Sequence, residues 1–488
     1  MRMEKRQMLW NFDGFADNIA VIGECGETLR YGELEALSAK LSEVDPRYPL
    51  VMMLCRNTFG AVSGYAALLG GGYPMLMMSA EAPAEIRRSV LNAYRPGLVF
   101  LPEEMRGEYA GMREACTVGD YVLLRTNYPE LYPVHPELGL LLTTSGSTGS
   151  VKYVRQSRNN ILFNAGVIAD YLGLRENDRS ITSVPMQYTY AQSMIHAALL
   201  RGACTVATRQ SFMENEFWDL VEEKEVSVFH GVPNTYEILR QIDLFSEDFP
   251  SLRTLTQAGG KLSRELHEYF TDYAAKTGRR FVVMYGQSEA TAAISWLAPE
   301  KSAEKIGSVG LAVPGGEISL LDAQDHTITA PHCPGEIVYR GGNVAMGYAQ
   351  GGEDLCKGDE WGSILRTGDV GETDEDGYLY IVGRLKRFIK VSGHRISLDE
   401  IDEKMMSDLN ILTVSSGIDE HLIVFVTDER EKNIVEDYIR RKIAVVRRAF
   451  SVAVIPEIPR NDAGKVLYGE LLERAKALIA VQHDGEKA

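Results

Sequence analysis

The sequence predicts an α/β protein with a large N-terminal domain of helix-covered sheets, a β-rich subdomain and a small α+β domain at the C-terminus. Three observations predict this fold class. Between residues 157 and 284, short β-branched runs alternate with amphipathic helical stretches, which indicates a mostly parallel sheet covered by helices. From about Gly335 the chain becomes glycine-rich β sequence, and beyond Lys386 short strands mix with helices. The 488 residues, 45% of them hydrophobic, are enough for one large core and at least one smaller one.

The helical stretches are marked by capping residues at both ends. Residues 157–173 begin at Ser157, a favourable N-cap, and stop at Gly173. Apolar residues recur on one helical face between these caps. Residues 263–278 have a serine and a glycine in the same two places. Both helices are therefore expected to pack on a sheet.

The strands expected in the first domain are short β-branched runs between turn signals. They lie at residues 179–185, 203–208, 226–232, 253–258 and 281–284. The β-rich subdomain is expected at 335–348 and 374–383. In the C-terminal module, strands are expected at 412–418, 422–427 and 451–456, and helices at 431–443 and 468–480. We place the domain boundary at Lys386, which gives domains of residues 1–385 and 386–488.

Composition excludes several classes of protein. A net charge of −17 argues against binding to nucleic acid or to an anionic membrane. The most apolar segment, residues 65–78, is too short and too interrupted by Gly and Pro to span a bilayer, and the N-terminus lacks a signal-type apolar stretch. We therefore expect a cytoplasmic protein with no integral membrane association. The six cysteines are scattered without a CxxC pair, which argues for reduced, mostly buried thiols.

The stretch "LLLTTSGSTGSVKY", residues 140–153, places an apolar run before a loop of Ser, Thr and Gly that ends at Lys152. Glycines let backbone N–H groups surround phosphate oxygens, hydroxyls add donors, and a lysine adds positive charge. Taken alone, the loop is also compatible with a flexible connector. The P-loop triplet of Gly, Lys and Ser or Thr does not occur in the chain, so any phosphate site is of another kind.

Two further turns follow expected strands, at "YGQSEAT" after 281–284 and at Gly259-Gly260 after 253–258. Ligands of such sheets bind beyond the carboxyl ends of the strands. Both turns are therefore expected to meet one ligand.

The motif "TTSGSTGSVK" resembles the phosphate loop of the adenylate-forming superfamily, which includes acyl-CoA synthetases, nonribosomal-peptide adenylation domains and luciferases. In the family's order, the chain also contains "YGQSEAT", "GEIVYRGGNVAMGYA", "RTGDVGETDEDGYLYIVGR", "RLKRFIKVSGHRISLDEID" and "PRNDAGKVLY". The motifs run from Thr143 to Tyr468, and weaker similarity begins near Tyr31. The resemblance implies ATP-dependent activation of a carboxylic acid to an acyl-adenylate with release of pyrophosphate. The acyl group then passes to a phosphopantetheine thiol, on CoA or on a carrier protein supplied in trans.

The resemblance also implies roles for individual residues in binding ATP and Mg²⁺. The β- and γ-phosphates are bound by Lys152 and by Thr144, Ser145, Gly146, Ser147, Thr148 and Gly149. Glu289 binds Mg²⁺ with help from the Thr144 hydroxyl. Ser288 reaches the α-phosphate, and Tyr285 packs on the adenine, next to Gly286 and Gln287. Asp369 and Arg384 bind the ribose hydroxyls. Lys465 bridges the incoming carboxylate and the α-phosphate, and is catalytic together with Glu289 and Lys152.

Each of these residues also has a simpler structural explanation when it is taken alone. Asp369 is compatible with a turn carboxylate, Lys465 with a solvated surface lysine, and Glu289 with a helix N-terminal carboxylate. Their joint occurrence favours the catalytic interpretation.

The C-terminal domain of this family is mobile. The resemblance implies that it rotates about a hinge at Lys386, where many members have Asp and Lys is also used, so that Lys465 withdraws before the thiol attacks. Gly393 then faces the pantetheine channel. One departure lies in the phosphate loop, where many members have Gly-x-Pro-Lys and this chain has Gly149-Ser150-Val151-Lys152. Losing proline loosens the loop, but no catalytic group is missing.

The acid is expected to lack a free α-amino group. Tyr188 stands at the aromatic gate, and amino-acid-activating members keep an Asp immediately after it to pair with the substrate ammonium, whereas this chain has Thr189. The acyl pocket is expected to be formed by Gly231, Val232, Tyr236, Gly259, Gly260 and Lys261. Lys261 either recognises a polar acyl group or points outward, and the outward orientation is slightly favoured.

Alternatives remain open for the acceptor of the acyl group and for the activity of the chain. No carrier-domain serine motif follows the C-terminal domain, and a basic cluster of Arg440, Arg441, Lys442, Arg447 and Arg448 either docks an acidic carrier protein or is a solvated helix face. Alternative functions are a stand-alone amino-acid-activating enzyme that loads a carrier, and a non-catalytic nucleotide-binding relative. A nicotinamide-dependent oxidoreductase is disfavoured because no strand is followed by GxGxxG.

Overall fold

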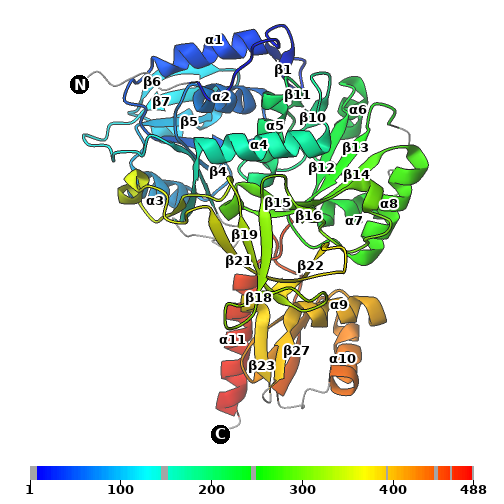
Figure 1. The fold of residues 1–488 in the computed structure, drawn as a ribbon. Coiled ribbons are helices and arrows are strands. Elements are labelled where there is room, and N and C mark those ends of the chain that lie inside the picture. The colour runs from blue at the N-terminus through cyan, green and yellow to red at the C-terminus, as the bar shows by residue number, and fades with distance from the viewer. Residues whose placement is uncertain are drawn as a thin grey trace. The chain divides into compact units, whose positions relative to one another are not determined.

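The computed structural model describes residues 8–143, 152–242, 249–391, 394–443, 449–461 and 464–485. The chain forms two compact units (Figure 1). The first unit comprises Met1–Glu317 and Tyr339–Leu365, and the second comprises Ile318–Val338 and Arg366–Ala488. The α/β fold class is confirmed. The second unit includes β sequence on the N-terminal side of Lys386, so the expected boundary for domain motion at that residue stays a prediction.

The larger sheet of the first unit has nine strands in the order β16-β15-β14-β13-β12-β10-β11-β1-β2. Its strands are β1 (Ile19–Ile22), β2 (Thr28–Arg30), β10 (Arg179–Ile181), β11 (Cys204–Val206), β12 (Val228–Gly231), β13 (Thr254–Gln257), β14 (Arg280–Gln287), β15 (Ala292–Leu297) and β16 (Leu311–Ala312). The neighbours from β1 through β11, β10, β12 and β13 to β14 are parallel, as the alternation of strands and helices predicts. The turns after β10, β12, β13 and β14 therefore lie at one edge of the sheet.

The other sheet of the first unit has eight strands in the order β20-β9-β8-β4-β3-β5-β7-β6. Its strands are β3 (Val51–Cys55), β4 (Met75–Ser79), β5 (Leu98–Pro102), β6 (Arg113–Val118), β7 (Tyr121–Arg125), β8 (Leu138–Thr143), β9 (Tyr153–Ser157) and β20 (Gly347–Ala349). Strands β8 and β9 pair antiparallel on either side of the expected phosphate loop, and β20 pairs antiparallel with β9. This sheet thus joins the region around Lys152 to a segment nearly two hundred residues later.

Helices cover both sheets, and their ends follow local capping signals. The helices of the first unit are α1 (Tyr31–Ser42), α2 (Phe59–Gly70), α3 (Ala84–Tyr94), α4 (Arg158–Leu172), α5 (Thr189–Leu200), α6 (Asn215–Glu223), α7 (Pro233–Gln241) and α8 (Arg264–Thr277), with short 3₁₀ turns η1 (Glu103–Tyr109), η3 (Ser288–Ala290), η4 (Pro299–Lys301) and η5 (Gly352–Cys356). Ser157 caps α4 by accepting a hydrogen bond from the Asn160 N–H, and Gly173 ends it with φ +60°. Both predicted helices are confirmed to within one residue at each end.

Helix α2 is buried from Gly60 to Gly70. It lies in a core cluster that joins strands of both large sheets, including Val21 of β1 and Met53 of β3. A Cβ atom at Gly64 would lie 2.1 Å from Cζ of Phe100, so only glycine allows the helix to approach strand β5 so closely.

The second unit contains a five-stranded sheet, a β-hairpin and a three-stranded sheet. The five-stranded order is β18-β17-β19-β21-β22. Bounds in this unit are β17 (Glu317–Leu321), β18 (Thr327–Ile328), β19 (Gly335–Arg340), β21 (Ile364–Thr373), β22 (Leu379–Arg384), η6 (Leu385–Arg387), β23 (Phe388–Val391), β24 (His394–Ser397), α9 (Leu398–Leu409), β25 (Val414–Ile418), β26 (His421–Val426), α10 (Glu429–Tyr438), η7 (Ile439–Ile443), β27 (Phe450–Val454) and α11 (Tyr468–Gly485).

Strand β26 separates two small cores in the second unit. Leu422, Val424 and Val426 pack in a cluster with residues of α9 and α10, whereas Ile423 and Phe425 pack in a cluster with α11. Figure 1 shows α10 and α11 on opposite sides of strands β23 and β27. The alternation follows from the two-residue period of a strand.

Several expectations differ from the structure in detail. The strand expected at 179–185 ends at Ile181, because the chain then turns toward α5. The helix expected at 431–443 ends as an α-helix at Tyr438 and continues as a π-helical turn. The six cysteines are free, as expected, but most of them are not buried: Cys55 and Cys204 are buried, Cys116 is intermediate, and Cys25, Cys333 and Cys356 are exposed.

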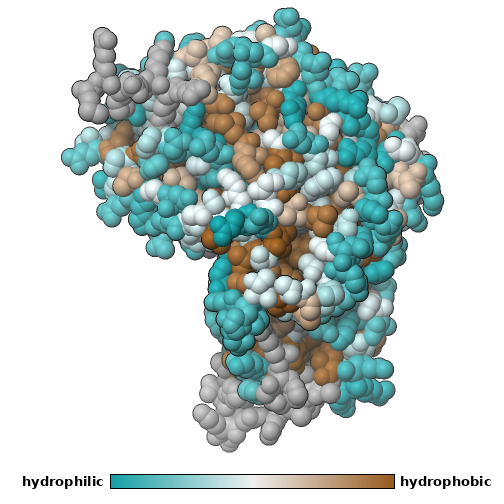
Figure 2. Space-filling view, viewed as in Figure 1, coloured by the Kyte–Doolittle hydropathy of each residue, from teal (hydrophilic) through white to brown (hydrophobic). Residues whose placement is uncertain are grey.

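Hydrophilic and apolar side chains are interspersed on the face of the first unit shown in Figure 2. Within the described part of the chain, no helix combines the length and apolar character that crossing a membrane requires.

Candidate active site

Two of the predicted catalytic residues, Lys152 and Glu289, contact the same side chain, Tyr348. The Lys152 Nζ lies 3.5 Å from the centroid of the Tyr348 ring, in a cation–π arrangement. The Tyr348 hydroxyl donates a hydrogen bond of 2.9 Å to Oε1 of Glu289. Burial, and then the negative charge of Glu289, raise the pKa of Tyr348 well above its ordinary value, so the phenol stays protonated and remains a donor.

Three different elements of the fold position these three residues. Lys152 directly precedes β9, Glu289 lies in the turn η3 after β14, and Tyr348 lies in β20. The register of β20 and β9 places Tyr348 opposite Val154, two residues after the lysine. The predicted phosphate-loop residues Thr144 to Gly149 lie outside the described residues, so their role and the Thr144 contribution to a metal site stay predictions.

The turn that carries Glu289 is held by backbone contacts on both sides. The Ala345 N–H donates to the Glu289 carbonyl, at 2.9 Å. Asn343 donates from Nδ2 to the carbonyls of Ala290 and Ala293, at 2.7 and 2.6 Å. A Cβ atom at Gly286 would lie 1.5 Å from the Ala292 carbonyl oxygen, so this position of the "YGQSEAT" motif admits only glycine.

Ser288, which is predicted to reach the α-phosphate, is bonded to Thr189. Their hydroxyl oxygens lie 2.6 Å apart. Gln156 of β9 donates from Nε2 to the Ser288 carbonyl, at 2.9 Å. Thr189 is the first residue of α5, and Tyr188 is its N-cap residue. Thr189, which is predicted to stand where amino-acid-activating enzymes carry Asp, therefore contacts a predicted nucleotide-binding residue.

Residues of the predicted acyl pocket lie at the carboxyl ends of β12 and β13. Gly231 ends β12, Val232 is the N-cap residue of α7, and Gly259 adopts φ +87°. Tyr236 is completely buried, and its hydroxyl donates to the Thr256 carbonyl at 2.7 Å. Its ring lies beneath Gly231, where a Cβ atom would approach the ring to 2.6 Å. Tyr236 thus supports this edge of the sheet from within the core.

Lys261 is exposed, and the outward orientation that the sequence slightly favoured stays a prediction. Its role in recognising a polar acyl group stays a prediction.

A buried polar network at the same strand ends was missed by the sequence analysis. His230 bonds through Nδ1 to the Thr256 hydroxyl at 2.8 Å and through Nε2 to the Ser180 hydroxyl at 2.5 Å. The Tyr190 hydroxyl also lies 2.6 Å from the Thr256 hydroxyl. Burial lowers the pKa of His230 to about 3, so the imidazole is neutral. The sequence signal for this network was His230, a polar residue in an apolar strand just before the edge at which a ligand is expected.

The predicted ribose pair is brought together in the second unit. Asp369 of β21 and Arg384 of β22 are directly opposite each other, and Nε of Arg384 lies 3.0 Å from Oδ1 of Asp369. The Asp369 side chain is 7% exposed and that of Arg384 is 57% exposed. The Asp369 carboxylate is therefore almost completely buried, and the more exposed Arg384 side chain lies against it.

Lys465 lies on a tight turn, as its sequence predicts. Its N–H donates to Oδ1 of Asn461 at 3.0 Å, and its carbonyl accepts from the Asn461 N–H at 2.9 Å. Gly464 adopts φ +72°. The turn holds the backbone of Lys465 while its side chain is half-buried.

The expected hinge, Lys386, lies in the turn η6 between β22 and β23. Its neighbour Arg387 donates to Asp399, to Oδ2 of Asp402 at 3.0 Å and to the Ser415 carbonyl at 3.1 Å. Burial raises the pKa of Asp402, although Arg387 acts in the opposite direction. The chain is thus anchored immediately after the expected hinge residue. Gly393 lies outside the described residues.

The basic cluster is only partly described. Arg440 is ion-paired with Asp437, and Arg441 lies 3.9 Å from the same carboxylate, whereas Arg447 and Arg448 lie outside the described residues. Pairing with Asp437 partly neutralises the described part of the cluster, and its role in docking a carrier protein stays a prediction.

Comparison with known proteins places these features in a family. A family model described as AMP-binding enzyme matches residues 9–349. A 2-succinylbenzoate–CoA ligase of Bacillus pumilus is 28% identical over 472 residues, which cover 94% of this chain and 91% of the relative. A 3-hydroxybenzoate–CoA ligase of Aromatoleum sp. is 26% identical and covers 95% of each chain. A 4-coumarate–CoA ligase of Humulus lupulus is 24% identical and covers 94% of this chain and 91% of its own.

Solved structures show the same fold. The o-succinylbenzoate CoA synthetase MenE of Bacillus subtilis, in complex with the acyl-adenylate intermediate OSB-AMP, has a TM-score of 0.74 and 21% identity, with 94% of this chain and 96% of that chain covered. ATP-bound MatB of Rhodopseudomonas palustris has a TM-score of 0.78 and 19% identity, with 95% and 97% covered.

Proposed function

The chain belongs to the AMP-binding enzyme family, and from this premise we propose that it is an AMP-forming acid–thiol ligase. It activates a small carboxylic acid with ATP to an acyl-adenylate and then transfers the acyl group to the thiol of CoA. The relatives that support this reaction are CoA ligases that match this chain over nearly its whole length.

The observation that carries the proposal is the array of Lys152, Tyr348 and Glu289. Lys152 lies over the ring of Tyr348 and Glu289 accepts from its hydroxyl, so the array offers a cation for phosphate oxygens and a carboxylate for a divalent cation. A non-catalytic nucleotide-binding relative would need neither a cation for a leaving pyrophosphate nor a second lysine such as Lys465.

In the first half-reaction, a carboxylate oxygen of the acid attacks the α-phosphorus of ATP. The bond from that phosphorus to the bridging oxygen breaks, and pyrophosphate leaves with the electron pair. Two anions must approach each other, so neutralising their charge is the central requirement. We assign Lys152 to the departing phosphates, and Lys465 to the carboxylate and the α-phosphate.

Glu289 fits the ligand chemistry of Mg²⁺, which binds proteins through one or two carboxylates and completes its shell with substrate phosphates and water. In the described ranges of the chain, no group of three or more His, Cys, Asp and Glu side chains forms a separate metal site. We propose that Glu289 holds a Mg²⁺ ion together with the phosphates of ATP; a solved structure of MenE contains both ATP and a magnesium ion. The ion supplies charge neutralisation at the phosphates.

In the second half-reaction, the CoA thiol loses its proton, its sulfur attacks the acyl carbonyl, and AMP leaves. Lys465 must withdraw from the reacting carbon before this step. A lysine on a turn in a mobile domain, with a hinge at Lys386, meets that requirement. The domain boundary of 1–385 and 386–488 is part of this proposal.

The acid is proposed to be an aromatic carboxylic acid without an α-amino group. The relatives named above act on 4-coumarate, 3-hydroxybenzoate and 2-succinylbenzoate. Thr189 bonds to Ser288 and provides no buried negative charge for a substrate ammonium. Because CoA and ATP are supplied in the cytoplasm, we place the reaction there.

The proposal is tested by ATP–pyrophosphate exchange over a panel of aromatic, fatty, hydroxy and amino acids. Exchange with aromatic acids, and its loss in Lys465→Ala, is the expected result. An α-amino acid as the preferred substrate would overturn the assignment of the acid. Exchange that is the same in wild type and Lys465→Ala would overturn the assignment of Lys465.

A further inference from the structure

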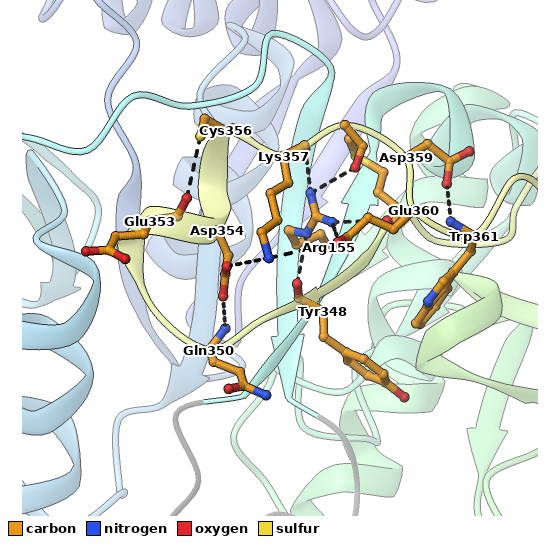
Figure 3. A network of polar contacts seen from close by, with 12 residues as sticks. Arg155, Tyr348, Gln350, Glu353, Asp354, Cys356, Lys357, Asp359, Glu360 and Trp361 are labelled. Carbon is orange, nitrogen blue, oxygen red and sulfur yellow. Dashed lines mark hydrogen bonds and ion pairs between the residues drawn. The ribbon is translucent and has the colours of Figure 1, made fainter.

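Arg155 has a completely buried side chain that binds the segment carrying Tyr348. Its Nε donates to the Tyr348 carbonyl at 3.1 Å, and its Nη2 donates to the Met346 carbonyl at the same distance. Nη1 donates to the carbonyls of Lys357 and Gly358. Nη2 also pairs with the Glu360 carboxylate. Figure 3 shows the guanidinium among Tyr348, Lys357 and Glu360, with the Tyr348 ring projecting away from it.

These partners engage every N–H donor of the planar guanidinium. Arg155 offers five N–H donors in a fixed geometry, and it satisfies backbone carbonyls on two sides of one loop. Removing the arginine takes a donor away from each of these carbonyls, which costs free energy for any buried carbonyl left without a partner. The Met346 carbonyl keeps a second donor, the Glu360 N–H at 2.9 Å. No motif in the sequence predicts a role for Arg155.

The loop itself is shaped to receive the arginine. Gly347 adopts φ +126°, a conformation that strongly favours glycine. A Cβ atom there would lie 2.7 Å from Oε2 of Glu360 and 2.9 Å from Nη2 of Arg155. Gly347 also pairs with Arg155 in the register of β20 and β9. The ion pair therefore lies directly against the backbone that precedes Tyr348.

Tyr348 is fixed from the other side by Trp361, which meets its ring edge-on at a centroid distance of 4.9 Å. The position of this ring sets where Lys152 and Glu289 stand relative to each other, because one contacts its face and the other its hydroxyl. The hydroxyl binds Oε1 of Glu289, which orients the carboxylate. Hydrogen bonds of this kind orient metal ligands in proteins.

Resting on the proposed function, we propose that Tyr348 is a further residue of the Mg·ATP site and that Arg155 is its positioning residue. Tyr348 orients the Glu289 carboxylate for the cation and holds the Lys152 ammonium beside the phosphates. Arg155 acts only through Tyr348, by holding the loop of residues 346–358.

The first test replaces Tyr348 by Phe, which keeps the ring and removes the hydroxyl. Isothermal titration with Mg·ATP is expected to show about tenfold weaker binding, the effect of losing a hydrogen bond to a charged group. In exchange assays the KM for Mg·ATP rises and the KM for the acid stays unchanged. Tyr121→Phe is the matched control, since its hydroxyl donates to the Leu54 carbonyl in the same sheet.

The second test replaces Arg155 by Lys, with Arg87→Lys as the matched control. Arg87 is also a buried arginine that binds two carbonyls and pairs with a glutamate. Arg155→Lys is expected to weaken Mg·ATP binding about tenfold at an unchanged KM for the acid, and Arg87→Lys is not. In a Tyr348→Leu background, which lacks the ring and the hydroxyl, Arg155→Lys should have little further effect.

Equal Mg·ATP affinity for Tyr348→Phe and Tyr121→Phe would overturn the role of Tyr348, even if Arg155→Lys failed to fold. Full additivity of Arg155→Lys and Tyr348→Leu would overturn the positioning role. Because titration with Mg·ATP needs no acid, these outcomes are distinct from a failure of the proposed function, which would appear as wild-type protein that binds Mg·ATP but exchanges with no acid of the panel.

Discussion

At the scale of single residues, the chemistry depends on how charges are placed around ATP. Lys152, Glu289 and Ser288 are all held by neighbours, through Tyr348 and Thr189. Thr189 is the position predicted to select against amino acids. Its neutral hydroxyl adds no negative charge beside Ser288.

Replacing Thr189 by Asp would place a carboxylate beside Ser288. Two carboxylates separated by about 5 Å at an effective dielectric constant of about 20 repel each other by roughly 3 kcal/mol, so the KM for a simple acid should rise on the order of a hundredfold. The KM is measured in the exchange assay. Thr189→Asn is the control, because asparagine has nearly the same shape as aspartate and carries no charge. Equal effects of Asp and Asn would show that charge at this position does not select the acid.

The residues of the site were predictable to different degrees. Lys152, Glu289, Asp369 and Lys465 stand in motifs whose local sequence is distinctive. Arg155 and Tyr348 depend on a contact between segments almost two hundred residues apart, and no local pattern encodes that pairing. His230 was missed because a histidine in a buried strand is commonly a core residue.

At the scale of elements, turns at the strand ends position the site, and helix ends are set by local signals. Caps at Ser157 and Gly173 predicted α4 because capping acts over one helical turn. Strand lengths were predicted less well, since pairing partners decide where a strand stops. The turn after β14 is the element on which the candidate site depends most.

Gly286→Ala should disrupt that turn. A Cβ atom 1.5 Å from a carbonyl oxygen forces the backbone apart, at a cost of about 3 kcal/mol of the free energy of unfolding. Urea unfolding followed by tryptophan fluorescence reports this change, because Trp10, Trp218, Trp296 and Trp361 all belong to the first unit. Gly107→Ala is the control, with nothing within 4 Å of its added Cβ and an expected change of less than about 0.5 kcal/mol. Equal stability of the two variants would contradict the tight turn.

Helix α5 carries a buried histidine that makes the first unit sensitive to acid. His196 lies 2.6 Å from the Tyr65 hydroxyl, and burial lowers its pKa to about 3. Between this value and about 6.5, the unfolded chain binds a proton that the folded chain excludes. The contribution of this histidine to the free energy of unfolding is therefore fully present above about pH 6.5. Below that pH it falls by about 1.4 kcal/mol for each unit by which the pH is lowered.

His196→Gln should reduce the slope of the free energy of unfolding against pH by the amount that corresponds to about one proton. Urea unfolding of the full chain at several pH values between about 5 and 8 measures this slope. An identical slope in the variant and the wild type would mean that His196 is already protonated in the folded protein.

At the scale of the whole molecule, the predicted catalytic groups are divided between two units. Lys152 and Glu289 belong to the first, whereas Asp369, Arg384 and Lys465 belong to the second. The division was predictable in outline from the change of sequence character after Gly335. The extent of the second unit was not, because β17 to β22 contain no signal that assigns them to one unit or the other.

If the C-terminal domain rotates about Lys386, restricting that residue should separate the two half-reactions. Lys386→Pro fixes one backbone torsion. We expect exchange within about threefold of wild type and at least about tenfold slower thioester formation. Single-turnover formation of the CoA thioester, compared with exchange, measures this. Equal loss of both activities would contradict a hinge at Lys386.

A heavy-oxygen label in the carboxyl group of the acid tests most directly whether the acid is activated through an adenylate. The labelled acid is incubated with ATP, Mg²⁺ and CoA, and the products are examined by mass spectrometry. Attack on the α-phosphorus predicts that one labelled oxygen appears in AMP, with unlabelled pyrophosphate. Label in inorganic phosphate together with ADP, or AMP without label, would contradict the claim.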